Sequence, residues 1–274
     1  MNDALELASS AAKAAATLLA ARAGRPGRTT TKSTSVDMVT EVDIAAGVLI
    51  ARILAEGDPS TPFVVEEPEV YELAEVERGT LDAPAVWGVD PIDGTTSFIH
   101  GYPTFSVAIA RLEDGVPVAG VVYNVPADEC LAASADGPAT LNGERIEVSK
   151  ACTISRSLLI TGFPYDRGAA LDRQMAIFGS IIRGVHGIRR DGSAAVDCCH
   201  VAAGRADGFW EFGLKPWDTC AGMLIATRAG AVASAMDGSP WTPSTADIIV
   251  AAPDLHPVLL EAIRRADPQQ GGDR

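Results

Sequence analysis

Residues 87–96 read WGVDPIDGTT, an apolar run that leads directly into two aspartates. The run predicts a strand that ends at Asp90, because the proline after it cannot donate to the next rung of a sheet. Asp93, Gly94 and Thr95 follow, and we expect them to open a helix. Two carboxylates at a strand end and beside a helix start can project into the same pocket.

This arrangement of acids suits a metal-assisted attack on a phosphate ester. Carboxylate oxygens are the ligands that Mg²⁺ prefers, and a shared aspartate can bridge two such ions. Backbone N–H groups at a helix start, here those of Gly94 and Thr95, form a natural site for an anion. Taken alone, the two aspartates also fit a simple turn at Asp90 and a helix cap at Asp93. The segment therefore needs support from distant parts of the chain.

The composition is that of a globular protein with a large core. The chain has 274 residues, of which 47% are hydrophobic and 21% charged, enough for one large domain or two closely packed ones. The formal net charge is −14, and an acidic surface repels nucleic acid and anionic lipid, so we expect neither as a partner. The five cysteines are odd in number and form no CxxC pair, which argues against a disulfide framework and a structural zinc site.

The N-terminus predicts an amphipathic helix that ends near Ala23. Asp3 and Glu6 stand where a signal peptide has basic residues, and Gly24 breaks the helix after the alanine-rich run. No apolar run approaches the roughly 18–20 residues that cross a bilayer. We therefore expect a cytoplasmic protein that does not bind membranes. The chain also lacks Walker and GxGxxG motifs, so the sequence does not support a nucleotide cofactor.

Two halves with different patterns make up the chain. The expected elements are helices over 40–56, 194–203 and 218–229 and strands over 62–65, 86–89, 106–111 and 118–123. Glu113-Asp114-Gly115, between the last two strands, predicts a hairpin turn. In the second half, apolar strands alternate with alanine-rich helical segments, which is typical of an α/β unit. We expect an α+β half over 1–145, an α/β half over 146–266 and a frayed tail over 267–274.

Three segments in different parts of the chain resemble the inositol monophosphatase family of lithium-sensitive, magnesium-dependent sugar phosphatases. They are DPIDGTTSFIHG at 90–101, WDTCAG at 217–222 and DMVTEVD at 37–43. The likeness covers nearly the whole chain, from the first helix to Ala262, with the segments in the family's order. It implies a layered α-β-α-β-α sandwich of the α+β class, with the site at the junction of the two halves, and a homodimer.

The resemblance also implies ligands for two or three Mg²⁺ ions. They are Glu66, Asp90, the backbone carbonyl of Ile92, Asp93 and Asp218. Glu66 depends on register, because the family usually has a glycine where this chain has Val65, and Glu67 is the alternative. Asp218 precedes an apolar helical run, so it can cap that helix and face a metal at the same time.

For catalysis, the resemblance implies that Thr95, paired with the carboxylate of Asp43, activates water beside Glu66 and the metals. An acceptor in this place would orient the attacking water while a metal lowers its pKa. Lys32 lies in the polar loop TTTKSTS over 29–35 and matches a lysine associated with the family's metal site. The alternative for Lys32 is an exposed side chain without a role.

Substrate contacts are implied in the same way. They are Gly94, Thr95, Gly192, Ser193, Ala194 and Glu211. Glu211 would accept hydrogen bonds from a sugar, and a carboxylate suits a polyol because hydroxyl groups are donors. Asp191 departs from the family, whose members more often have a neutral residue there. A negative charge near the phosphate would disfavour a dianionic substrate.

The implied function is hydrolysis of a small phosphate monoester by a metal-activated water, with inositol monophosphate as the first candidate. Histidinol phosphate is the strongest rival, because its cationic amine suits Glu211 and Asp191. 3′-Phosphoadenosine phosphate and fructose-1,6-bisphosphate are further candidates, although no aromatic platform for a base accompanies Glu211. Outside this class, a regulatory relative without catalysis, which binds a metal or a protein, stays open.

Overall fold

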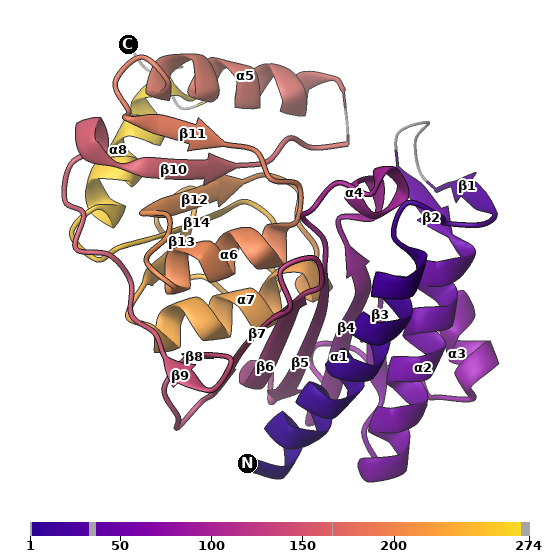
Figure 1. Cartoon of the computed structure of the whole chain (residues 1–274). Coiled ribbons are helices and arrows are strands. Elements are labelled where there is room, and N and C mark those ends of the chain that lie inside the picture. Colours follow the sequence, from indigo (N-terminus) through magenta and orange to yellow (C-terminus); the bar gives the residue numbers. More distant parts are fainter. Residues whose placement is uncertain (1, 33–36, 166, 270–274) are drawn as a thin grey trace.

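The computed structural model describes residues 2–32, 37–165 and 167–269. Its longer helices are α1 (Asn2–Arg22), α2 (Glu41–Gly57), α5 (Ala169–Ile181), α6 (Ala194–Ala202), α7 (Pro216–Arg228) and α8 (His256–Ala266). Helices α1 and α2 cover one face of a seven-stranded sheet, α6 and α7 lie between this sheet and a five-stranded one, and α5 and α8 cover the outer face of the latter (Figure 1). The predicted α-β-α-β-α sandwich is therefore confirmed.

The seven-stranded sheet belongs to the first half of the chain. Its strands are β3 (Phe63–Val65), β4 (Ala85–Asp93), β5 (Ser106–Glu113), β6 (Val116–Asn124), β7 (Glu129–Ser134), β8 (Thr140–Leu141) and β9 (Glu144–Arg145). They lie side by side in chain order, with β3 parallel to β4 and every later pair antiparallel. Asp114 and Gly115 both have positive φ angles, as the hairpin turn expected between β5 and β6 requires.

The five-stranded sheet belongs to the second half. Its strands are β10 (Leu158–Thr161), β11 (Gly187–Arg189), β12 (Gly208–Glu211), β13 (Val232–Ala235) and β14 (Ile248–Ala251), in the spatial order β11-β10-β12-β14-β13. Strand β10 pairs in parallel with β11 and β12, which are reached through the helices α5 and α6. Strand β14 is antiparallel to both of its neighbours, so the sheet is mixed.

Three apolar clusters fill the spaces between the layers. The first lies between α1, α2 and the seven-stranded sheet, the second between the two sheets around α6 and α7, and the third under α5 and α8. The middle layer is packed closely. A Cβ atom at Gly120 of β6 would lie 3.1 Å from the backbone of Ala221 in α7, so a larger residue would push the helix and the strand apart by a few tenths of an ångström.

Helix α1 has, over Asp3–Arg22, the length and apolar character of a membrane-crossing helix. This corrects the expectation that no apolar run in the chain reaches that length. Core helices of soluble proteins and signal sequences meet the same criteria. In this fold, a row of alanines together with Leu19 is buried against α2 and the seven-stranded sheet, so the apolar face of α1 belongs to the core.

The remaining elements are short and lie near the junction of the two halves or at the surface. They are β1 (Thr29–Thr31), β2 (Met38–Thr40), α3 (Glu69–Ala74), α4 (Thr95–His100) and the 3₁₀ helix η1 (Ile154–Arg156). Strands β1 and β2 form an antiparallel hairpin from the polar segment that was expected to be a loop or a hairpin. Residues 33–36 of that segment lie outside the described residues.

Two expectations about local structure are wrong. The proline after Asp90 does not end β4, because the pairing with β5 shifts register after Asp90 and resumes between Asp93 and Ser106. A bulge of this kind leaves residues unpaired, so it accommodates a proline that has no N–H to donate. The expected fraying of the tail does not hold for Asp267, whose buried carboxylate pairs with Arg173. Residues 270–274 lie outside the described residues.

Candidate active site

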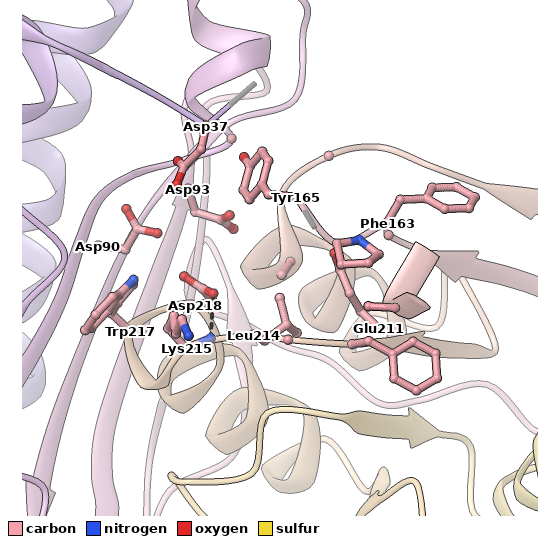
Figure 2. A pocket seen from close by; sticks show the side chains of 18 of the residues that line it. Asp37, Asp90, Asp93, Phe163, Tyr165, Glu211, Leu214, Lys215, Trp217 and Asp218 are labelled. Atoms are coloured by element: carbon pink, nitrogen blue, oxygen red, sulfur yellow. Dashed lines mark hydrogen bonds between the residues drawn. The ribbon is translucent and has the colours of Figure 1, made fainter. Parts of the chain in front are cut away.

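A cavity of about 710 Å³ lies at the junction of the two halves. It is lined by most of the predicted site residues: Lys32, Glu66, Asp90, Ile92, Asp93, Gly94, Thr95, Gly192, Ala194, Glu211 and Asp218. Figure 2 shows the carboxylates of Asp90, Asp93 and Asp218 turned toward one region, with Glu211 farther along the cavity. Acids that are far apart in the sequence thus converge on one space.

Asp93 is fixed by the start of α6, which belongs to the other half of the chain. Its Oδ2 atom accepts hydrogen bonds from Ser193 Oγ at 2.6 Å and from the Ala195 backbone N–H at 2.7 Å. Gly94 follows with a φ angle of 99°, and a Cβ atom there would lie 2.9 Å from the Gly192 carbonyl oxygen. Only glycine allows the chain to turn at this junction.

This arrangement gives Ser193 a different position from the expected one. Ser193 caps α6 by accepting from the Val196 N–H at 3.4 Å, and its hydroxyl donates to Asp93. It does not line the cavity, whereas Gly192 and Ala194 on either side do. The prediction that the Ser193 hydroxyl meets the sugar is therefore not supported.

Asp218 is positioned by the first turn of α7. Pro216 begins the helix, and the Asp218 Oδ2 atom accepts from the Lys215 backbone N–H at 2.8 Å. This is the capping arrangement in which an acid at the third helical position satisfies a backbone donor before the helix. The predicted capping role of Asp218 is confirmed, and the residue lines the cavity at the same time.

The three aspartates are costly to ionise in the absence of a cation. Burial raises the pKa of Asp90 well above its usual value, and the charge of Glu66 raises it further. Burial also raises the pKa of Asp93 to about 6, although the hydrogen bonds from Ser193 and Ala195 oppose the shift. The pKa of Asp218 rises through burial and through the charge of Asp93. Buried carboxylates that repel one another need a counter-charge.

Lys32 supplies a counter-charge at the edge of this cluster. Its ammonium donates to Glu66 Oε1 at 2.6 Å and also pairs with Glu67. Burial alone would lower the pKa of Lys32, but the two glutamates outweigh it and raise the pKa above its ordinary value. Glu66 lines the cavity, whereas Glu67 is buried beside it, which favours Glu66 as the residue that faces a ligand.

Thr95 and Asp43 form the predicted pair. The Thr95 hydroxyl donates to Asp43 Oδ1 at 3.0 Å and lies 3.1 Å from the Ile92 carbonyl oxygen. The other carboxylate oxygen of Asp43 accepts from the backbone N–H of Thr40 at 2.8 Å and from its hydroxyl at 2.5 Å. Asp43 is therefore held from both sides, and it orients Thr95 at the cavity wall.

Glu211 ends β12 at the other end of the cavity. Burial raises the pKa of this carboxyl to about 8, although the charge of Arg190 lowers it. The side chain lies against Gly162, where an added Cβ atom would be 2.0 Å from the carboxylate carbon. A glycine at position 162 is thus a condition for the observed position of Glu211.

Similarity to known proteins agrees with this geometry. The model of the inositol monophosphatase family matches residues 1–267. The chain belongs to the inositol monophosphatase family. A Synechocystis protein named inositol-1-monophosphatase is 38% identical over 265 residues, which are 97% of this chain and 90% of that protein. The structure of the inositol monophosphatase from Anabaena has a TM-score of 0.85 at 35% identity and covers 96% of both chains.

A relative from Neisseria meningitidis carries a different name. It is 35% identical over 264 residues, which are 96% of this chain and 98% of that protein, and is named putative Nus factor SuhB. As a member of the inositol monophosphatase family, the chain is a phosphoric monoester hydrolase that acts on small phosphorylated substrates. The family is generally metal-dependent.

The acidic side chains of this family member have the oxygen ligands that a hard cation prefers, but those that the structure describes are not already arranged around one. Within residues 2–32, 37–165 and 167–269, no group of three or more His, Cys, Asp or Glu side chains is arranged to hold a metal ion. One oxygen of Asp93 and one of Asp218 are engaged by hydrogen bonds, and Glu66 is engaged by Lys32. An all-oxygen set with mutual repulsion suits Mg²⁺, whose charge would draw these side chains together.

Several cavity residues have no signal in the sequence. Gly162, Phe163 and Tyr165 follow β10, and Arg190 precedes the α6 start. None belongs to a motif whose chemistry can be read from residue types, and only the fold brings them to the cavity. Asp191, in contrast, does not line the cavity, so the objection that its charge faces the phosphate loses its basis.

Proposed function

We propose that this hydrolase uses Mg²⁺ to release phosphate from a monoester of a small polyol, with inositol monophosphate as the first candidate. The observation that carries the proposal is the division of one cavity into two ends. Asp90, Asp93 and Asp218 meet at one end, and Glu211 lies at the other. A phosphate ester of a sugar-sized alcohol has the same division, with its charge at one end and its hydroxyl groups at the other.

The phosphate end would hold the ions through Glu66, Asp90, the Ile92 carbonyl, Asp93 and Asp218. When bound, Mg²⁺ lowers the pKa of a coordinated water and neutralises charge on the phosphate. The Thr95 hydroxyl has one hydrogen, which it donates to Asp43, so its oxygen keeps lone pairs that can accept from the attacking water. The backbone N–H groups of Gly94 and Thr95 would orient the ester.

The end of the cavity at Glu211 and Arg190, which we call the alcohol end, favours a neutral polyol over a cationic amine. Glu211 has its pKa raised to about 8 by burial, so near pH 7 much of it is protonated and can both donate and accept. Arg190 lines the same cavity and would repel a positive charge. These two features support inositol monophosphate over histidinol phosphate, since Asp191 does not line the cavity to balance Arg190.

A panel of esters tests the proposal directly. Phosphate release would be measured with Mg²⁺ for inositol 1-phosphate, histidinol phosphate, 3′-phosphoadenosine 5′-phosphate and fructose 1,6-bisphosphate. We expect the largest kcat/KM for inositol 1-phosphate and a loss of most turnover in Asp90→Asn. A higher kcat/KM for histidinol phosphate would contradict the polyol assignment, and turnover that persists in Asp90→Asn or with excess chelator would contradict the metal assignment.

A regulatory role without catalysis is the second candidate, because some relatives are named Nus factor SuhB. The presence of all four expected metal-binding acids, Glu66, Asp90, Asp93 and Asp218, in the cavity supports catalysis instead. The net charge of −14 also disfavours direct contact with nucleic acid. Following the family resemblance, we further propose a homodimer, which light scattering of the purified protein would test. Because Asp3 and Glu6 stand where a signal peptide has basic residues, we also propose a cytoplasmic location, which fractionation of cells would test.

A further inference from the structure

Arg173 on α5 lies at the alcohol end of the cavity and has no part in the proposed chemistry. Its side chain is 16% exposed. Its guanidinium forms a two-pronged contact with Asp267, with Nε 3.0 Å from Oδ1 and Nη2 2.7 Å from Oδ2. The Asp267 side chain is completely buried. The segment after α8 is therefore tied to α5 through a buried ion pair, and Gln269 in this segment lines the cavity.

The same guanidinium holds the backbone that follows Glu211. Its Cζ atom stacks 4.4 Å above the centre of the Phe212 ring, and Nη1 donates to Asp247 Oδ2 at 3.3 Å. The other oxygen of Asp247 accepts from the Gly213 N–H at 3.1 Å. Arg173 and Asp247 thus hold the two residues directly after Glu211 from both sides.

Glu211 depends on these neighbours because little else holds it. Among the described residues, the structure shows no hydrogen bond or ion pair to its carboxylate. Its backbone is the last of β12 to pair, opposite Ile248 of β14, and its side chain rests against Gly162. The position of a side chain at a strand end follows the position of the residues after it.

We propose that Arg173 is a positioning residue for the alcohol end of the substrate, which fixes Glu211 through Phe212 and Gly213 and makes the segment after α8 part of the specificity-determining wall. This inference rests on the proposed contact between Glu211 and a polyol. It concerns the class of cyclic polyol monophosphates, whose ring reaches from the phosphate end to Glu211. Short esters such as glycerol 2-phosphate would bind without that contact.

The test removes the ion pair as a unit, because a single substitution would leave one charge buried without a partner. The double variant Arg173→Met/Asp267→Asn is compared with Glu211→Ala and with a control, Arg205→Met/Glu129→Gln. Alanine is used at position 211 because an amide would still donate and accept, as the protonated carboxyl does. The control deletes a similar two-pronged pair, with contacts of 2.7 and 2.6 Å, between residues that do not line the cavity. The kcat and KM values are measured with Mg²⁺ for inositol 1-phosphate and glycerol 2-phosphate.

We expect the Arg173 double variant to raise KM for inositol 1-phosphate at least about five-fold with kcat within about two-fold, the pattern of a lost binding contact. KM for glycerol 2-phosphate and all constants of the control should stay within about two-fold. In a Glu211→Ala background, which lacks the contact, the same double substitution should add no further increase in KM. This last result separates positioning from general loosening of the fold.

Two outcomes overturn the inference in different ways. If Glu211→Ala raises KM for inositol 1-phosphate and the Arg173 double variant does not, or raises KM equally for both substrates, the positioning role is wrong and the polyol contact stands. If Glu211→Ala leaves KM for inositol 1-phosphate unchanged, the polyol contact itself is wrong and the positioning role is overturned with it.

Discussion

Asp43 and Asp218 occupy the same position in two helices, yet only one of them faces the cavity. Each is the third residue of its helix, α2 or α7, and each accepts from the backbone N–H before the helix at 2.8 Å. Asp43 gives its second oxygen to Thr95 and is buried. Among the residues that the structure describes, a donor reaches only one oxygen of Asp218, and the residue lines the cavity.

The difference shows that the same helix cap can orient a neighbouring hydroxyl or leave a carboxylate oxygen free to face the cavity. A cap fixes a carboxylate at the start of a helix, and the residue opposite decides what the other oxygen does. Opposite Asp43 stands a hydroxyl that must be oriented, whereas opposite Asp218 stand Asp90 and Asp93, with which it can share a cation. The cap therefore fixes geometry in both helices, and only Asp218 keeps coordinating capacity.

The largest effect is expected from Asp218→Asn. An amide oxygen still accepts from the Lys215 N–H, so the helix start should persist and the melting temperature without metal should change little. The charge that would hold Mg²⁺ is lost, and we expect turnover to fall roughly 100-fold or more. Thermal shift with increasing Mg²⁺ provides the separate measurement. A variant that keeps both its turnover and its Mg²⁺-dependent shift would contradict the role of Asp218.

Asp43→Asn is the matched substitution at the other cap, and its effects should be distributed differently. The amide N–H₂ must face one of the donors that now surround the carboxylate, so the free energy of unfolding should fall by about 1–3 kcal/mol. Misorientation of Thr95 should lower turnover by roughly ten- to hundred-fold. The Mg²⁺-dependent thermal shift should stay as in the wild type. Loss of that shift would show that Asp43 acts on metal binding rather than on Thr95.

Glu211 is a third acid of the site; it is half-buried at the end of β12 and has no cap. Because its pKa is about 8 in the fold against 4.5 ordinarily, the folded state holds this proton more tightly. Its contribution to stability is therefore complete below pH 4.5 and is lost as the pH rises through 8. Glu211→Gln should leave the melting temperature at pH 5 nearly unchanged and raise it at pH 9, by about 2–4 °C for each kcal/mol recovered. An equal shift at both pH values would contradict this assignment.

The sequence predicts the local parts of this comparison well. The helix start after Thr40, the capping position of Asp218 and the turn at Asp114-Gly115 depend on neighbouring residues, and all three are confirmed. The layer order followed from the family resemblance and is confirmed by the structure. The convergence of the acids on one cavity was also expected on that basis, although their roles stay predictions.

Contacts between distant residues explain what the sequence did not reveal. Asp267 lies in a polar segment with proline and glycine, a composition typical of a frayed tail. Its ion pair with the distant Arg173 holds its side chain in the core. Pro91 should end a strand by its own chemistry, but the anchoring of Asp93 on α6 draws the chain back into pairing with β5. The sequence gives no reason for a glycine at position 162, because that reason is the contact with the distant Glu211 side chain.

The smallest effect is expected where a carboxylate is held across the fold rather than by a cap. Ser193 has one hydroxyl hydrogen, and Asp93 as a carboxylate can only accept it, so Ser106 must donate to Ser193 across their 3.1 Å contact. Ser106→Ala removes this outer bond and leaves the bonds to Asp93 intact. At about 1 kcal/mol, its loss should weaken Mg²⁺ binding by about five-fold or less. Ser193→Ala removes the inner bond and should weaken Mg²⁺ binding more, as calorimetric titration can measure. If Ser193→Ala leaves Mg²⁺ binding unchanged, the Ala195 N–H alone orients Asp93. One backbone donor at a helix start would then suffice, as it does at the caps of Asp43 and Asp218.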